Sequence, residues 1–317
     1  MAYYKKAVYT YRGIMEKDFW RSIAHNDYQL LEGLTIEGLT PELLSKLGTA
    51  DPELRDYYIY TTLEKWIERG LYTPEQLREL LTQLLQNLGE GLGEQGDDRV
   101  FLRSFSALTI SEILKYEQSH HFLRKDEVQA LLEQSITYLV REQDLRGYVS
   151  GKGWAHAVAH SGDLLGVLAR NRHVQTRELE RIVTAIAEKM TFPVEYVYTT
   201  LDEERLALAV IAVLTRGLLP ASYWRWWCRP LLEVEAALHW EDTPNFARQE
   251  EICAYHNTRT FLRSLYFQLT LAGYQLPGAQ ELITAIIKTL RELDPGFYSV
   301  DVMTIIDPTL NIDDLRP

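Results

Sequence analysis

The chain has 317 residues, of which 46% are hydrophobic and 25% are charged. It is therefore long enough to bury a large core and is unlike an intrinsically disordered sequence. Its 33 Lys and Arg residues against 45 Asp and Glu residues give a formal net charge of −12. Because such a charge repels phosphate backbones, we expect no nucleic-acid partner.

Cysteine usage and the length of the apolar runs predict a compartment. The two cysteines, Cys228 and Cys253, have no paired spacing, which excludes a disulfide framework and a cysteine-based zinc site. The most apolar run, residues 206–214, is far shorter than the roughly 20 residues that span a bilayer. The first 17 residues lack the apolar segment of a signal peptide. These features predict a cytoplasmic protein with no membrane partner.

Taken in chain order, the predicted elements are almost all helices. Residues 1–51 are predicted to form an N-terminal cap with helices at Glu16–Ala24 and Pro41–Leu47, and residues 294–317 form an extended C-terminal tail. Between them, apolar residues at helical spacing predict five helical hairpins over residues 52–293. These hairpins pair Pro52–Arg69 with Glu75–Leu88, Asp98–Tyr116 with Asp126–Val140, Gly153–Arg170 with Arg177–Met190, Asp202–Arg216 with Pro230–Leu238, and Tyr255–Leu271 with Gln280–Leu293.

The second helices of these hairpins recur at a regular interval. Their first core residues, which we call the anchors, are spaced 51, 51, 52 and 51 residues apart and are Leu77, Val128, Leu179, Leu231 and Leu282. A fixed period is typical of repeat proteins in which each hairpin buries its face by stacking on the next. We therefore predict a single all-α domain that forms an open superhelix, a HEAT/armadillo-like solenoid. HEAT and armadillo units are somewhat shorter, so a closed α/α toroid is the alternative.

The densest group of reactive side chains follows a glycine-rich connection. His156, His160 and Asp163 are spaced at i, i+4 and i+7, which places them on one helix face. Two imidazoles and a carboxylate can bind one divalent metal ion with a coordination position left open. Zinc, manganese and iron all suit these ligands. We expect this stripe to line the concave groove, opposite core residues such as Trp154. The alternatives are a non-metal ligand-binding or catalytic role for His156, His160 and Asp163, and a structural row of hydrogen-bonded histidines.

Five further residues are weaker candidates for ligand binding. Lys152 lies in a turn between glycines that could hold an anion, and Arg103 would belong to a column of arginines along the groove. Asp202 and Glu203 begin a predicted helix and could face the histidines, and Asp27 lies in the N-terminal cap. Each has a structural alternative. Lys152 would lie in a hairpin connector, and Arg103 would pair with acidic rim residues. Asp202 and Glu203 would cap a helix, and Asp27 would form a turn.

Several segments together resemble a bacterial family of unknown function, the domain of unknown function numbered two-seven-eight-five. The resemblance covers about residues 16–220. It rests on Lys17-Asp-Phe-Trp, Asn26-Asp-Tyr, Gly48-x-x-Asp51-Pro-Glu-Leu-Arg-Asp56, Val100-Phe-Leu-Arg-Ser-Phe-Ser-Ala-Leu108, Asp144-Leu-Arg-Gly-Tyr148, Gly151-Lys-Gly-Trp-Ala-His156 with His160 and Asp163, and Glu203-Glu-Arg-Leu-Ala207. It implies a bacterial, single-domain, largely helical protein, and it implies no activity.

Two functions are consistent with this sequence. Helical solenoids usually serve as binding surfaces, so the first hypothesis is a protein that binds a peptide, a protein or a small anionic ligand in a polar concave groove. The alternative is a metal-dependent enzyme, hydrolytic in type, that uses His156, His160 and Asp163 with an acid from the next repeat as base. Fold alone does not distinguish the two.

Overall fold

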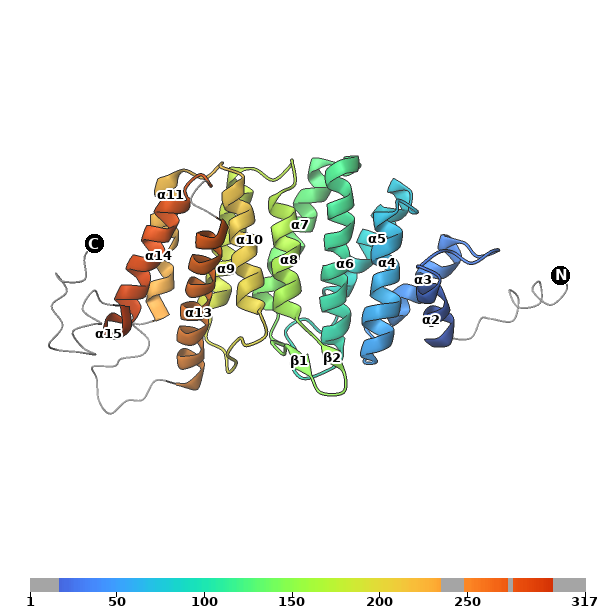
Figure 1. The fold of residues 1–317 in the computed structure, drawn as a ribbon, viewed down its shortest axis with the longest axis horizontal. Helices are drawn as coiled ribbons and strands as arrows, with labels where there is room; N and C mark the ends of the chain where they lie inside the picture. The colour runs from blue at the N-terminus through green and yellow to red at the C-terminus, as the bar shows by residue number, and fades with distance from the viewer. Residues whose placement is uncertain (1–16, 235–247, 273–275, 299–317) are drawn as a thin grey trace. The chain divides into compact units, whose positions relative to one another are not determined.

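The computed structural model describes residues 17–234, 248–272 and 276–298 (Figure 1). Most of these residues lie in helices, which confirms the prediction of an all-α protein. The described β-structure is one two-stranded antiparallel sheet, in which Tyr148 faces Trp154 and Val149 faces Gly153. The chain forms two compact units, Met1–Val174 and Gln175–Pro317.

The first unit contains nine described helical or strand elements before its last helix, α8. They are α2 (Lys17–His25), α3 (Ile36–Lys46), η1 (Glu53–Tyr60), α4 (Thr61–Glu68), α5 (Pro74–Asn87), α6 (Arg99–His120), α7 (Lys125–Arg141), β1 (Tyr148–Val149) and β2 (Gly153–Trp154), followed by α8 (Ala157–Ala169). Helix α6 packs between α4 and α8 and also contacts α5. Helix α7 contacts α8. The first helices of three successive hairpins are therefore neighbours within this unit.

The second unit is built from helices of more varied length. They are α9 (Thr176–Thr191), α10 (Asp202–Thr215), α11 (Ala221–Trp227), the 3-10 helix η2 (Pro230–Leu232), α13 (Gln249–Ala272), α14 (Ala279–Leu293) and α15 (Pro295–Tyr298). Helix α13 packs against α9, α10 and α14. Helix α14 also contacts α11, η2 and α15.

Most predicted helices are present with boundaries within a few residues, and the differences are local. The predicted helix Pro52–Arg69 begins as the π-helix η1, whose wider turns continue directly into α4. The predicted helix Gly153–Arg170 begins instead with strand β2, because Gly153 has a φ of +79° and His156 a φ of +50°, which helical residues do not adopt. The helix itself begins at Ala157.

The fourth hairpin and the tail differ from the prediction in other ways. Helix α11 precedes the predicted Pro230–Leu238, of which η2 covers the first three residues, and residues 235–238 lie outside the described ranges. The first residues of the predicted extended tail form the short helix α15. Residues 299–317 of the tail lie outside the described ranges, as do residues 1–16 of the predicted cap.

The anchors mark the same place in successive helices. All five are at most 1% exposed. Leu77, Val128, Leu179 and Leu282 are each the fourth residue of their helix. The backbone N–H of each of these four donates to the carbonyl of the residue just before its helix, at 2.9–3.1 Å. Leu231 is also buried, but it lies in the short η2.

The residue before three of the anchors helps to explain why their helices begin where they do. The side chains of Gln76, Glu127 and Glu178 each accept a hydrogen bond from the backbone N–H of the residue three positions earlier. This is one half of a capping box, which satisfies a backbone donor that the helix leaves unpaired. In α5 the other half is present as well, because the Thr73 hydroxyl accepts from the Gln76 N–H. Local sequence therefore sets these helix starts.

Candidate functional site

The predicted histidine stripe does not line a groove. His160 is only 8% exposed, and its Nδ1 lies 2.7 Å from the hydroxyl of Ser104 on α6. Its ring also meets the edge of Phe105 at 5.4 Å between centroids. Of the residues in α8, all but Asp163 are buried, because the helix packs against both α6 and α7. His160 therefore belongs to the contact between α6 and α8.

His156 is placed by the strained start of α8. It is the residue before the helix, in the left-handed region, and its ring stacks on Trp154 at 4.3 Å between centroids. Trp154 was expected in the core but is 41% exposed. The two rings thus form a stacked pair at the end of the β-hairpin, where an exposed aromatic face shields the imidazole.

The predicted metal site is not formed. Within the described ranges, which include His156, His160 and Asp163, no three His, Cys, Asp or Glu side chains form a group that could hold a metal ion. The Ser104–His160 contact does not supply a nucleophile for a substrate either, because Ser104 is fully buried and its hydroxyl donates to the backbone carbonyl of Ala155. The histidines therefore have a structural environment.

Arg103 is buried and does not belong to a column of arginines along a groove. It is 1% exposed and forms a bidentate ion pair with the fully buried Glu142, at 2.6 Å from Nε to Oε2 and 2.8 Å from Nη2 to Oε1. Its Nη1 also donates to the carbonyl of Glu90 at 2.8 Å. The predicted structural alternative was an ion pair with acidic rim residues, whereas the observed partner is the residue that follows α7.

The turn that carries Lys152 is held by contacts with two other parts of the first unit. The Lys152 Nζ lies 2.7 Å from Asp98, and both side chains are about two-fifths exposed. The Lys152 carbonyl accepts from the buried guanidinium of Arg55 at 2.9 Å. A Cβ added to Gly153 would lie 2.7 Å from the Cβ of Pro52, so this position requires glycine. Lys152 thus helps to hold a hairpin against η1.

Asp27 has a similar structural role in the N-terminal part of the first unit. It adopts a φ of +51°, and its carboxylate lies 3.0 Å from Arg69. The Arg69 guanidinium also donates to the Asp27 carbonyl at 2.6 Å. This ion pair is largely exposed, so it contributes little to the free energy of unfolding. Asp27 therefore forms the turn that the sequence offered as an alternative.

Asp202 and Glu203 both lie in the first turn of α10, but their environments differ. Asp202 is 1% exposed and accepts a hydrogen bond from the Thr200 hydroxyl at 2.7 Å. Glu203 is 7% exposed, and its Oε2 has no hydrogen-bond partner among the described residues. Of the residues predicted from the sequence to bind a ligand, Glu203 lines a large cavity among the described residues.

That cavity, which we call the α13 groove, has a volume of about 730 Å³ and lies entirely within the second unit. Its walls come from α10, α13, α14 and α15. They are formed by Glu203, Glu204, Thr260, Arg263, Ser264, Tyr266, Phe267, Ile287, Leu290, Arg291 and Tyr298. The groove therefore combines two carboxylates, two guanidiniums, hydroxyl groups and aromatic rings.

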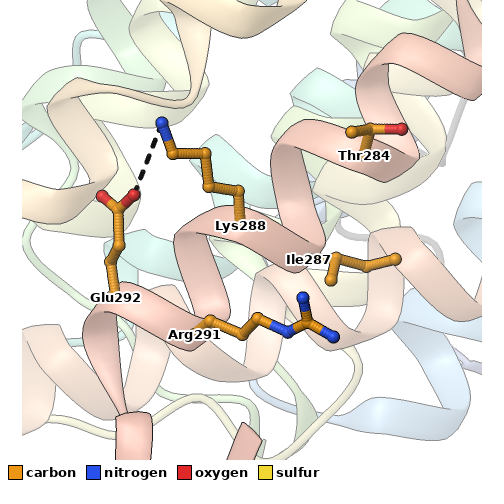
Figure 2. Close-up of a pocket in the computed structure, with 5 residues that line it drawn as sticks. All are labelled: Thr284, Ile287, Lys288, Arg291 and Glu292. Carbon is orange, nitrogen blue, oxygen red and sulfur yellow. Dashed lines mark ion pairs between the residues drawn. The ribbon is translucent and has the colours of Figure 1, made fainter. Parts of the chain in front are cut away.

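The two arginines carry its positive charge. Arg263 is exposed on α13, and Arg291 is exposed on α14 with its Nε donating to the Tyr298 carbonyl at 3.2 Å. Neither guanidinium forms an ion pair with a residue in the described ranges. Figure 2 shows a smaller neighbouring cavity of about 310 Å³, which Arg291 and Ile287 also line. Lys288 and Glu292 line it as well and pair with each other at 3.6 Å.

The negative charge of the groove is centred on Glu203. Burial raises the pKa of the Glu203 carboxyl above its ordinary value, and the charges of Asp202 and Glu204 add to this rise. A hydrogen bond from its own backbone N–H lowers the pKa, but by less. The carboxylate is therefore destabilised in its present surroundings, and a positively charged group beside it would relieve that cost.

Sequence reasoning missed Arg263, Arg291 and the aromatic residues of the groove. A signal for them exists, because Arg263, Phe267 and Leu271 follow one another at intervals of four residues on a predicted helix. Phe267 is 60% exposed and Leu271 is 71% exposed. An apolar stripe at helical spacing usually faces the core, so the pattern alone places Phe267 and Leu271 in the interior.

These features define an all-helical protein with a charged groove in its second unit. Residues 88–267 match the family model described as "Protein of unknown function (DUF2785)", which covers more than half of the chain. The protein belongs to this family, as the resemblance predicted. Comparison with curated proteins and with solved structures finds no match. Within the described ranges, no helix is both long and apolar enough to cross a bilayer.

The buried ion pair gives a first prediction. In Glu142→Gln the guanidinium of Arg103 stays buried without its counter-charge, so we expect the free energy of unfolding to fall by about 3–5 kcal/mol. Denaturant unfolding followed by circular dichroism measures this. The control is Asp98→Asn, which breaks the half-exposed pair with Lys152 and should cost at most about 1 kcal/mol. Equal losses in the two variants would contradict the structural role of the Arg103–Glu142 pair.

The raised pKa of Glu203 gives a second prediction. The folded state binds the proton of the Glu203 carboxyl more tightly than the unfolded state does. The contribution of this proton to the free energy of unfolding is therefore complete below the unfolded pKa and is lost as the pH rises through the folded pKa. Glu203→Gln removes that loss. The unfolding free energy of the variant, relative to the parent protein, should therefore increase from about pH 4 towards neutral pH. A difference that stays constant over this range would show that Glu203 titrates normally.

Proposed function

We propose that the protein binds a short peptide or another small anionic ligand through a carboxylate group, and that the α13 groove is the site. This keeps the function expected from the sequence and moves it away from the histidine stripe. Binding rather than catalysis is favoured because the groove holds charged and aromatic groups for recognition. Helical-repeat proteins commonly provide such surfaces.

One observation carries this proposal: Arg263 and Arg291 line the same groove, and neither forms an ion pair with a described residue. Arginine presents a planar set of donors that matches a carboxylate in two parallel hydrogen bonds. Elsewhere in the described part of the chain, arginines such as Arg103 and Arg69 are already paired with acids. Tyr266 and Phe267 supply apolar surface next to the two guanidiniums, which suits the side chain of a peptide residue.

The proposed setting of the groove is an open superhelix of stacked hairpins that forms a single domain. Its support is the position of four anchors as the fourth residue of their helices. The neighbouring first helices α4, α6 and α8 in one unit, and α10 and α13 in the other, also follow chain order. We further propose that the protein is bacterial and works in the cytoplasm, where its two buried cysteines would stay reduced.

The groove gives a third prediction, which concerns binding. Tripeptides with alanine at both ends and a varied central residue are titrated into the protein and followed by NMR chemical shifts or calorimetry. We expect at least one to bind, and we expect Arg263→Gln and Arg291→Gln each to weaken that binding about tenfold or more, since each removes a charge-assisted contact.

The control for this experiment is Arg225→Gln, which removes an exposed arginine of α11 that does not line the groove. It should leave the affinity unchanged. The proposal fails if no tripeptide binds, or if the two groove variants bind as tightly as the parent protein.

The superhelix gives a fourth prediction, measured by small-angle X-ray scattering. A compact globule of 317 residues has a radius of gyration of about 20 Å. An open array of hairpins holds its mass further from the centre, so we expect a value clearly above this figure. A value close to the compact one would contradict the open superhelix and favour the closed toroid.

A further inference from the structure

We propose that Glu203 binds a positively charged group of the same ligand, so that the α13 groove takes a zwitterion, such as a short peptide with a free amino terminus. This inference rests on the proposed function, in which Arg263 and Arg291 bind the carboxylate. It names the class of ligand: a small molecule that carries an ammonium and a carboxylate group together.

Glu203 differs from the acids on either side of it. Asp202 accepts a hydrogen bond from Thr200, and Glu204 accepts one from the side chain of Gln268 at 3.0 Å. Glu203 lies between them, is more than nine-tenths buried, and has an oxygen with no hydrogen-bond partner among the described residues. A buried polar oxygen without a donor costs free energy. A ligand that brings a donor into the groove would recover it.

The helix terminus does not account for this arrangement. Acidic residues in the first turn of a helix are stabilised by the partial positive charge of its N-terminus. That explains why Asp202, Glu203 and Glu204 occur together at the start of α10. It does not explain why the middle one is buried against a cavity with an unsatisfied oxygen, since an exposed carboxylate would interact with the terminus equally well. The burial of Glu203 in the groove is therefore a second, independent observation.

The charges around Glu203 select a cation. Asp202 and Glu204 place two further acidic groups on the same helix turn, and their charges oppose another negative charge at Glu203. A ligand ammonium would be attracted by all three. Tyr266 and Phe267 line the same groove, and aromatic rings also attract cations. Arg263 and Arg291 supply positive charge from α13 and α14, so the groove is complementary to a ligand with both signs of charge.

The test uses a tripeptide that binds the parent protein, in four forms: with both ends free, with the amino terminus acetylated, with the carboxyl terminus amidated, and with both ends blocked. Acetylation removes the ammonium and keeps the carboxylate. We expect it to weaken binding about tenfold or more, because Glu203 then faces a neutral group. Amidation should weaken binding by a similar factor through the arginines.

Two variants assign the effect to Glu203. In Glu203→Gln the preference for the free over the acetylated peptide should disappear, whereas the preference for the free over the amidated peptide should remain. Glu281→Gln is the matched control, since it removes another acid from the first turn of a helix in this unit and lies outside the groove. It should keep both preferences. Thermal unfolding of each variant checks that it is folded.

The outcomes separate this inference from the proposed function. Binding that is lost on amidation but unchanged on acetylation would overturn the zwitterion and leave the carboxylate site standing. The zwitterion would also be overturned if acetylation of the peptide weakened its binding to the parent protein and to Glu203→Gln by the same factor. If no tripeptide binds the parent protein, the proposed function fails first and the inference fails with it.

Discussion

A charged group that is removed from water must find a partner within the protein, and this requirement governs the buried charged residues of the first unit that the structure describes. Arg103 and Glu142 satisfy each other inside the first unit with two short hydrogen bonds. Arg55, also fully buried, donates to three backbone carbonyls and lies over the ring of Phe101 at 4.3 Å. Because an unpaired buried charge costs several kcal/mol, neither arginine is free to serve a ligand. At Glu203, by contrast, a buried carboxylate oxygen has no hydrogen-bond partner among the described residues.

This requirement explains why residues with reactive side chains became parts of the framework. The connections between helices leave backbone carbonyls exposed at their turns, and side chains from earlier helices bind them. Arg55 reaches the carbonyl of Lys152, which is 97 residues away in sequence, and Ser104 bridges the carbonyl of Ala155 and the ring of His160. The glycine-rich connection that resembled an anion-binding turn is therefore held as a hairpin. The histidines that resembled metal ligands lie where that hairpin meets α8.

The α13 groove has the opposite character. Its arginines and its buried glutamate come from three helices of the second unit and do not neutralise one another within ion-pair distance. Because these positive and negative side chains do not pair with one another, they can still attract the charged groups of a ligand. Because buried charges such as Arg103 and Glu142 are paired, the unpaired charges of the groove add no unpaired charge to the helical core of the first unit. This contrast between the paired interior and the unpaired groove is the physical basis of the proposed function.

The sequence by itself determined most of the helices and several of their starts, because apolar spacing and capping residues act over a few neighbouring positions. The 51-residue interval identified anchors such as Leu77 and Val128, all of which are buried. It could not determine which charges pair, because the partners are distant along the chain: Arg103 lies 39 residues from Glu142, and Ser104 lies 56 residues from His160. Only the tertiary structure decided that the apolar stripe of Phe267 faces outward and that Arg263, Arg291 and Glu203 share one groove. Each of these results depends on how separate helices pack, and local pattern carries no information about that.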